Sequence, residues 1–513
     1  MEADNSETNN YFEIRAFGKD ALIYSLSYAL GLIISFIQVY IIAKYLPITD
    51  FGYWQIFMLY STYVGILSLG FTEGILMRWG GKKLDQISDE IGLAFKFLVL
   101  EQTILVLCLG LFLYFMIQPY LQPLVLLLMA FAFIFNLTLF LNFTSQAIKR
   151  FKLLAAINAV RGLLFLIFTL FLIFLLHYPD YQYIIAANIL SYILLFLALY
   201  FCYWRYFWGN RPLQTIQISH KSNVAWKNIL SRPKLKEIME FLGFSSTLSY
   251  GTENIKLGFY VLLGNFGVTI LLTLDRLMVN SFFSIEHFAI YAFASMVVIV
   301  IYTMVKAISD VFFPYLPNIS RKHQENAYSL GQSIIILAAA ATLSIYFPFA
   351  KLVDVFLPQY VASLNIIKIL LCSIGFGSLA QIVHINYYKL LRKQRHYFLV
   401  FTLVLIISSI SILFAIRMWG TLESVAIALL ISFIIWYVLF EMNLRSTVGG
   451  EKGNLLKVLA FFICYVSAFW VSSILVEWFI AQMIIYLCLF LVLSWLFYRR
   501  QIMELADIFH RII

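Results

Sequence analysis

Residues 122–148 read QPLVLLLMAFAFIFNLTLFLNFTSQAI, a run of 27 residues that contains no charged side chain. A helix needs about 20 apolar residues to cross the roughly 30 Å of hydrocarbon in a bilayer, so this run is long enough to span one. Similar runs recur along the chain: 62% of its 513 residues are hydrophobic and 12% are charged. A soluble domain is about half apolar and about a quarter charged. The sequence therefore predicts an all-α polytopic membrane protein, and it excludes soluble enzymes, DNA-binding proteins and disordered chains.

The apolar runs predict about fourteen transmembrane helices. The ten-residue alternation of apolar and polar residues that is typical of a membrane barrel is absent from the sequence. An even number of spans places both termini on the same side of the membrane. The predicted spans lie at 19–45, 51–77, 91–117, 122–148, 152–177, 181–207, 256–283, 286–316, 327–349, 361–391, 396–417, 420–443, 455–476 and 478–498.

Lysine and arginine residues collect on one side of these spans. Of the 36 basic residues, 27 fall in the termini and loops of one side and three in the loops of the other side, while six lie within spans or at their edges. Short cytoplasmic loops carry such an excess. We therefore expect a multi-pass protein of the cell (cytoplasmic, or inner) membrane with both termini in the cytoplasm. The net charge of +10 is spread over separate loops, which argues against a nucleic-acid-binding domain.

The longest polar interruption lies between the sixth and seventh spans and divides the chain. Seven basic residues fall within 205–240, and apolar residues recur there at helical spacing. This pattern favours an amphipathic segment on the inner leaflet, and a plain connector is the alternative. The predicted parts are a cytoplasmic N-terminal tail (1–18), an N-lobe of six spans (19–207), a cytoplasmic basic amphipathic connector (208–255), a C-lobe of six spans (256–443), two extra C-terminal spans (455–498) and a cytoplasmic tail (499–513).

The two predicted lobes contain similar turns. Phe51-Gly52-Tyr53 opens the second span, and Phe288-Ala289-Ile290-Tyr291 opens the eighth span 237 residues later. Because six spans per repeat is an even number, the two repeats would insert in the same orientation, with a substrate path between the two bundles. The repeat therefore favours a transporter over a channel or an enzyme.

Several stretches resemble the polysaccharide and O-antigen (Wzx-type) flippases of the multidrug/oligosaccharidyl-lipid/polysaccharide (MOP) exporter superfamily. In that family a short turn with Phe-Gly-x-Tyr/Trp leads into a second helix that ends in Leu-Gly-like small residues and an arginine. Ala289 departs from the pattern, because the matching turn usually has glycine. The resemblance extends over about 20–445, and it is carried by AKYLPITDFGYW (43–54), LSLGFTEGILMR (67–78), LDRLMVNSFF (274–283), ISDVFFPYLPNIS (308–320), YYKLLRKQRHYF (387–398) and WGTLESVAIALLIS (419–432).

The resemblance implies a fold and a function. Members of the superfamily fold as two six-helix lobes around a central cavity, sometimes with two extra helices at the end. They carry lipid-linked oligosaccharides across the cytoplasmic membrane by alternating access, commonly driven by an ion gradient. For this chain, the implied partners are membrane lipids, a lipid-linked glycan and H⁺ or Na⁺ as the coupling ion.

Charged side chains within the spans are candidate functional residues, because a charge inside hydrocarbon is costly. A lipid pyrophosphate is an anion that arginine or lysine would bind. Arg161 has no acidic residue one helical turn away, and the alternative is a side chain that points back to the cytoplasmic surface. For Arg276 the alternative is a salt bridge between the lobes near the outer gate. The candidate substrate-binding cations are Arg161, Arg276, Lys306 and Lys368.

Three acidic residues are candidates for ion coupling or gating: Glu101, Asp275 and Asp310. A buried carboxylate can bind and release a proton near neutral pH. Asp310 lies four residues from Lys306 on the same helix face, so an internal ion pair is the alternative there. We expect His384 to be a packed polar residue, because no acid or second histidine lies at ligand spacing. The sequence predicts no catalytic residue, metal site or cofactor.

Three functions remain open at this point. A flippase for a lipid-linked oligosaccharide or polysaccharide precursor is favoured, because the deep cations slightly outnumber the deep acids. A drug or metabolite exporter of the same superfamily is the alternative, and it would favour acids and aromatic residues in the cavity. A membrane glycan polymerase or ligase is the weakest hypothesis, since the predicted outer loops are only a few residues long. We therefore expect a transporter rather than an enzyme.

Overall fold

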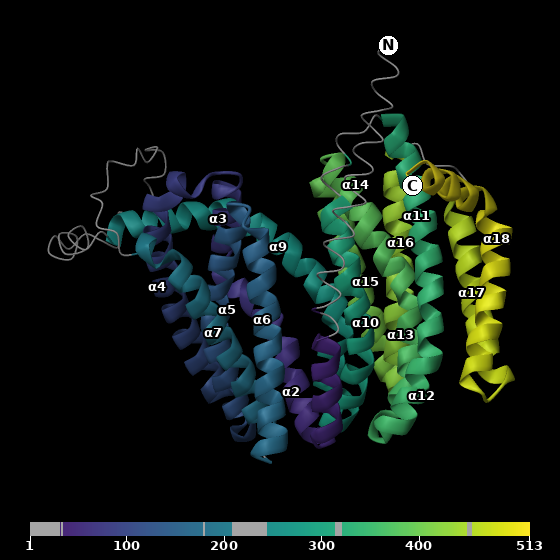
Figure 1. The fold of residues 1–513 in the computed structure, drawn as a ribbon, viewed down its shortest axis with the longest axis horizontal. Coiled ribbons are helices and arrows are strands. Elements are labelled where there is room, and N and C mark those ends of the chain that lie inside the picture. Colours follow the sequence, from purple (N-terminus) through teal and green to yellow (C-terminus); the bar gives the residue numbers. More distant parts are fainter. Residues whose placement is uncertain are drawn as a thin grey trace, which may run out of the picture. The chain divides into compact units, whose positions relative to one another are not determined.

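The computed structural model describes residues 31, 34–177, 180–207, 244–312, 316, 321–448 and 454–512, and every regular element in this part of the chain is helical (Figure 1). The described residues form two compact units, Tyr53–Leu272 and Met1–Gly52 with Thr273–Ile513. The all-α, multi-pass fold is confirmed. Within the described residues, twelve helices are long and apolar enough to cross a membrane: Leu84–Met116, Pro119–Ala147, Ala156–Leu175, Tyr181–Phe207, Thr247–Phe282, Ile285–Val305, Gln324–Phe356, Ser363–Leu390, Arg395–Trp419, Leu422–Leu444, Asn454–Leu475 and Phe479–Glu504.

The first two predicted spans differ from this regular pattern. The span at 19–45 lies partly outside the described residues, and its described part contains the shorter apolar helix Ile34–Tyr45. The span at 51–77 is broken, because Ile48–Ser68 and Phe71–Trp79 meet at an angle of 61°. Leu69 and Gly70 separate the two pieces with φ of 49° and 90°. Two consecutive left-handed residues cannot continue a right-handed helix, and glycine adopts this conformation at little cost.

The unit Tyr53–Leu272 is a bundle in which α5 packs against both α4 and α7, while α6 packs against α7. Its buried centre is rich in aromatic side chains, including Phe71, Trp79, Phe97, Phe140 and Tyr203. Its helices are α2 (Ile48–Ser61, which begins before the unit), α3 (Phe71–Trp79), α4 (Leu84–Met116), α5 (Gln122–Ala147), α6 (Phe151–Leu170), α7 (Tyr181–Phe207) and the first part of α9 (Phe244–Phe282).

Glycine lets α3 and α9 meet at their backbones. A Cβ atom on Gly74 would overlap the backbone of Asn254, and a Cβ atom on Gly258 would overlap the backbone of Gly70 and Gly74. Small residues of this kind allow membrane helices to approach closely. The Leu-Gly and Gly positions that carry the sequence resemblance therefore form a helix crossing.

The helix α9 begins at Phe244, twelve residues before the predicted start at 256. The added turns contain Glu253 and Asn254, which have low hydropathy, but Arg78 of α3 contacts both side chains. The predicted span begins later than the helix, because a hydropathy profile treats a charged side chain as polar even when it is paired with a residue of another helix. The tail at 1–18 and most of the connector lie outside the described residues, and the predicted domain boundaries stay predictions.

In the second unit, α13 is the central helix. In the helix Ser363–Leu390, 94% of the most apolar 18-residue stretch is buried inside the protein. The helix α13 packs against α10, α11 and α16. The helices α17 and α18 pack side by side (Figure 1). The helix α18 also contacts α12. The helices are α10 (Ile285–Phe312), α11 (Arg321–Thr342), α12 (Tyr346–Phe356), α13 (Ser363–Ser378), α14 (Ile385–Leu390), α15 (Gln394–Trp419), α16 (Leu422–Val448), α17 (Asn454–Leu475) and α18 (Phe479–Ile512).

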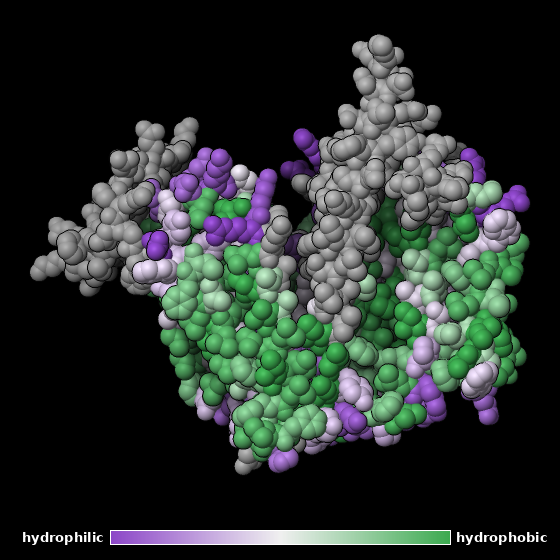
Figure 2. Space-filling view, viewed as in Figure 1, coloured by the Kyte–Doolittle hydropathy of each residue, from purple (hydrophilic) through white to green (hydrophobic). Residues whose placement is uncertain are grey.

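The outer helix faces are apolar. Leu107, Leu111 and Phe115 of α4 are exposed, as are Leu399 and Ile410 of α15. Figure 2 shows hydrophobic side chains over the flank of the α4–α7 bundle and hydrophilic ones gathered near α3. A soluble protein rarely exposes apolar patches of this extent, so these faces are suited to contact lipid.

Candidate functional site

Arg161 is half-buried on α6, and its guanidinium lies over the ring of Tyr192 from α7, 4.5 Å from the ring centroid. Tyr192 is itself held edge-on by Phe131 of α5, with 5.0 Å between the ring centroids. Among the described side chains, no carboxylate forms a salt bridge with Arg161. Arginine often stacks on aromatic faces in this way, which leaves its N–H donors at the edge of the plane.

Asp275 and Arg276 are both buried on α9, with 2% and 7% of their surface exposed. Tyr291 of α10 donates a hydrogen bond of 2.9 Å to Oδ2 of Asp275. Oδ1 of Asp275 is buried and accepts no hydrogen bond from the described residues. Asp275 thus has a hydrogen-bond partner on a neighbouring helix, Tyr291 of α10.

Lys368 of α13 lies between two neighbouring helices. Its Nζ donates to Oγ of Ser473 over 3.2 Å, and it lies 5.2 Å from the ring centroid of Trp470 on α17 and 5.4 Å from that of Tyr346 on α12. The contacts place the ammonium in a polar and aromatic environment within its unit. Lys306 and Asp310 belong to α10, but their side chains lie outside the described part of the structure.

Glu101 of α4 has two buried carboxylate oxygens that accept no hydrogen bond from the described residues. The side chain of the neighbouring Gln102 contacts another element, because its Nε2 donates to the carbonyl of Leu67 over 2.8 Å. Asn136 of α5 donates to Oε1 of Gln102 over 2.9 Å and to the carbonyl of Val64 over 3.0 Å. The amides of Gln102 and Asn136 thus donate hydrogen bonds to backbone carbonyls shortly before the break at Leu69–Gly70.

A polar cluster joins three helices around Arg78, at the end of α3. Arg78 lies 3.8 Å from Glu90 of α4 and 3.4 Å from Glu253 of α9, and it stacks 4.6 Å from the ring centroid of Tyr250. Glu90 also accepts hydrogen bonds of 2.9 Å from Trp79 and 2.7 Å from Tyr250. This cluster holds the first turns of α9 against α3 and α4.

The most completely buried ionisable cluster in the described part of the chain contains His384, which the sequence predicts to be a packed polar residue. Glu441 of α16 lies 3.1 Å from Nε2 of His384 and accepts hydrogen bonds of 2.6 Å from both Tyr328 and Gln332 of α11. Glu441 is not among the predicted site residues. The two partners are 57 positions apart on different helices, so no spacing on one helix could have indicated the pair.

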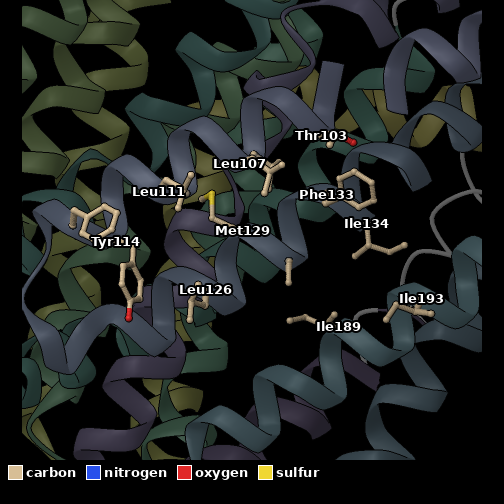
Figure 3. A pocket seen from close by; sticks show the side chains of 14 residues that line it. Thr103, Leu107, Leu111, Tyr114, Leu126, Met129, Phe133, Ile134, Ile189 and Ile193 are labelled. Atoms are coloured by element: carbon tan, nitrogen blue, oxygen red, sulfur yellow. The ribbon is translucent and has the colours of Figure 1, made fainter. Parts of the chain in front are cut away.

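An apolar groove of about 770 Å³ lies on the outer face of the first unit, between α4, α5 and α7 (Figure 3). Leu107 and Leu111 of α4 line it together with Met129 of α5 and Ile193 of α7. Its lining offers few polar groups, among them Thr103 and Tyr114. A surface of this composition is suited to lipid tails rather than to an ionic ligand.

The chain matches the family model described as polysaccharide biosynthesis protein over residues 17–320. Among solved structures, it is similar to the lipid II flippase MurJ in an inward closed conformation, with a TM-score of 0.63, 14% sequence identity, and coverage of 94% of this chain and 100% of that chain. A MATE transporter variant from Vibrio cholerae gives a TM-score of 0.47 at 13% identity, with coverage of 85% and 99%. No curated protein matches the chain by sequence.

The family match covers more than half of the chain, including the stretches at 43–54 and 67–78 that carry the sequence resemblance. The likeness to MurJ spans both compact units and confirms the predicted fold. The assignment to the Wzx-type flippases within the family stays a prediction. The chain therefore belongs to the polysaccharide biosynthesis protein family.

Proposed function

We propose that this protein moves a lipid-linked oligosaccharide or polysaccharide precursor across the cytoplasmic membrane by alternating access. The family match over residues 17–320 carries this proposal. The fold supports it, because a solved structure of similar fold over nearly the whole chain is described as a lipid II flippase. The protein acts as a transporter without catalysing a covalent step.

The position of Arg161 supports an anionic substrate. A lipid pyrophosphate offers several acceptor oxygens, and a guanidinium binds such a group through two parallel hydrogen bonds. Tyr192 covers one face of the Arg161 guanidinium and fixes its plane, so that the N–H groups at its edge are oriented in advance. In this proposal Arg161 contacts the pyrophosphate, and Arg276, Lys306 and Lys368 stay candidate substrate-binding cations.

A transport assay with arginine variants tests the proposal. The purified protein is reconstituted into liposomes with a fluorescent lipid-pyrophosphate-linked oligosaccharide, and movement between leaflets is followed with a membrane-impermeant quencher. We expect Arg161→Lys to slow transport about tenfold, because an ammonium cannot make the bidentate contact, and Arg161→Ala to slow it further. Tyr192→Phe keeps the aromatic face and should retain most of the activity.

Lys351→Ala is the matched control, because Lys351 is an exposed cation that pairs with Asp354 on the same helix, 2.8 Å away. This variant should transport at the wild-type rate. Wild-type transport by Arg161→Ala, with the variant reconstituted at an equal level, would contradict the role of Arg161. Failure of the unmodified protein to move the labelled lipid would contradict the proposed function itself.

A further inference from the structure

Glu441 and His384 form a buried ionisable pair. Their exposed fractions are 1% and 0%, and Tyr328 and Gln332, which donate to the same carboxylate, are 1% and 0% exposed. Oε2 of Glu441 thus lies near three donors: the hydroxyl of Tyr328, the amide of Gln332 and Nε2 of His384. A carboxylate surrounded by donors is stabilised in its ionised form, because the ionised group accepts hydrogen bonds at both oxygens, whereas the protonated group would place a further O–H donor among them.

The surrounding helices fix this arrangement. His384 is the last residue of the π turn Leu379–His384, which interrupts the helical path from α13 to α14. Such single π turns often occur at functional sites. On the opposite side, Asn454 of α17 donates to Oε1 of Gln332, and this contact orients the Gln332 amide so that its NH₂ group faces Glu441.

The second nitrogen of His384 is unused. If Nε2 carries the hydrogen that points to Glu441, Nδ1 of the neutral ring holds a lone pair. Nδ1 is buried and has no hydrogen-bond partner among the described residues. The pair then has a net charge of −1 and one vacant position for a proton.

Few other ionisable groups lie near the pair. The rings of Tyr328 and Tyr437 lie 6.3 Å and 5.4 Å from the His384 ring, and Tyr387 contacts Tyr328 with 4.8 Å between ring centroids. The Tyr437 hydroxyl is also buried, and it has no partner among the described residues. Within the described side chains, Glu441 forms a salt bridge with His384 and with no lysine or arginine. The charge of the pair is therefore set mainly by His384.

We propose that Glu441 and His384 are a proton-binding site. Hydronium transfers a proton to the Nδ1 lone pair of His384: an N–H bond forms, one O–H bond of hydronium breaks, water is released, and the pair changes from a net charge of −1 to neutral. Sodium is disfavoured as the ligand, because Na⁺ needs oxygen lone pairs whereas the groups around Oε2 direct hydrogens toward it. The use of this site to drive transport rests on the proposed function, but proton binding itself does not.

Proton binding would also change the packing. A protonated Nδ1 needs an acceptor, because an unpaired buried N–H group is destabilising. The described residues offer none in this conformation. The protonated state therefore favours a different arrangement of the π turn relative to α16, which links protonation to a conformational change.

Nitrogen NMR of the protein labelled with ¹⁵N-histidine tests proton binding directly. The chain has seven histidines, and His384→Gln identifies the signal of interest. Acidification of the protein in lipid nanodiscs should convert His384 from the Nε2–H tautomer to the imidazolium. A single neutral tautomer at every pH, or a signal that shifts with Na⁺ at fixed pH, would overturn the proposal.

Substitutions of Glu441 and of Tyr328, which contacts it, should change the proton affinity of His384 in opposite directions. Glu441→Gln removes the negative partner and should lower the proton affinity of His384 about tenfold or more. Tyr328→Phe removes one donor to the carboxylate, which increases its attraction for the imidazolium, and should raise the proton affinity several-fold. Tyr302→Phe is the control, because the Tyr302 hydroxyl donates to the carbonyl of Ser373 and should leave the titration unchanged. Equal proton affinities of His384 in the three variants would refute the pairing of His384 with Glu441.

A second assay asks whether the site drives transport. In the liposome system, an imposed pH gradient should accelerate movement of the labelled lipid by the wild type, and His384→Gln should lose this acceleration. Retained acceleration would exclude the pair as the coupling site. If the wild type moves no labelled lipid at all, the proposed function fails, whereas the NMR titration still decides whether the pair binds a proton.

Discussion

Arg78 illustrates how single polar side chains hold this apolar protein together. It contacts Glu90 of α4 and Glu253 of α9 and stacks on Tyr250, so one guanidinium joins three helices. Lys351, in contrast, pairs only with Asp354 on its own helix and is exposed. Exposed pairs contribute about 0–1 kcal/mol, whereas hydrogen bonds to charged groups in partly buried networks contribute more.

At this scale we expect Arg78→Ala to lower the free energy of unfolding by about 1–2 kcal/mol, because Glu253 and Asn254 lose their partner. Arg78→Lys should lower the free energy of unfolding by a smaller amount, since one ammonium cannot reach all the acceptors that the guanidinium contacts. Denaturant unfolding of the purified protein in detergent measures both values. Lys351→Ala should stay within about 0.5 kcal/mol of the wild type, and an equal effect of the two alanine variants would contradict this account.

The crossing of α3 and α9 depends on the absence of side chains. A Cβ atom on Gly258 would overlap the backbone of Gly70 and Gly74, which cannot move aside as a flexible side chain can. Gly264 lies in the same helix, but a Cβ atom there would meet no heavy atom within 4 Å. The two glycines are therefore a matched pair on one element.

Gly258→Ala should lower the free energy of unfolding by about 1–3 kcal/mol, because the added methyl group separates the two helices. Gly264→Ala should raise it by about 0.5–1 kcal/mol, since alanine restricts the unfolded chain more than glycine does. Unfolding curves of both variants in the same detergent provide the comparison. The explanation fails if Gly258→Ala is as stable as Gly264→Ala.

The elements also show what the sequence could and could not predict. Uninterrupted apolar runs such as 122–148 predicted their helices because length and hydropathy alone decide whether a helix can cross a membrane. The break at Leu69–Gly70 lies inside an apolar run, so hydropathy gave no sign of it. The pair His384–Glu441 was missed for another reason: a periodic pattern assigns residues to a face of one helix but does not say which two helices meet.

At the scale of the whole molecule, the distribution of basic residues predicts the topology. The termini and loops predicted to be cytoplasmic hold 27 of the 36 lysines and arginines. Reporter fusions at Arg150, Lys322 and Arg395 should therefore report the cytoplasm, and a fusion at Asp180 should report the opposite side. Activity of any of these reporters on the wrong side would contradict the predicted fourteen-span arrangement.

The proposed substrate is the central claim about the whole molecule, and a comparison of two substrates tests it most directly. Liposomes containing the wild-type protein are assayed in parallel for movement of a fluorescent lipid-pyrophosphate-linked oligosaccharide and for uptake of a cationic dye. We predict that the lipid-linked oligosaccharide crosses at least about tenfold faster than in protein-free liposomes, and that the dye does not. Uptake of the dye without movement of the lipid-linked oligosaccharide would contradict the claim and would indicate a drug exporter of the same superfamily.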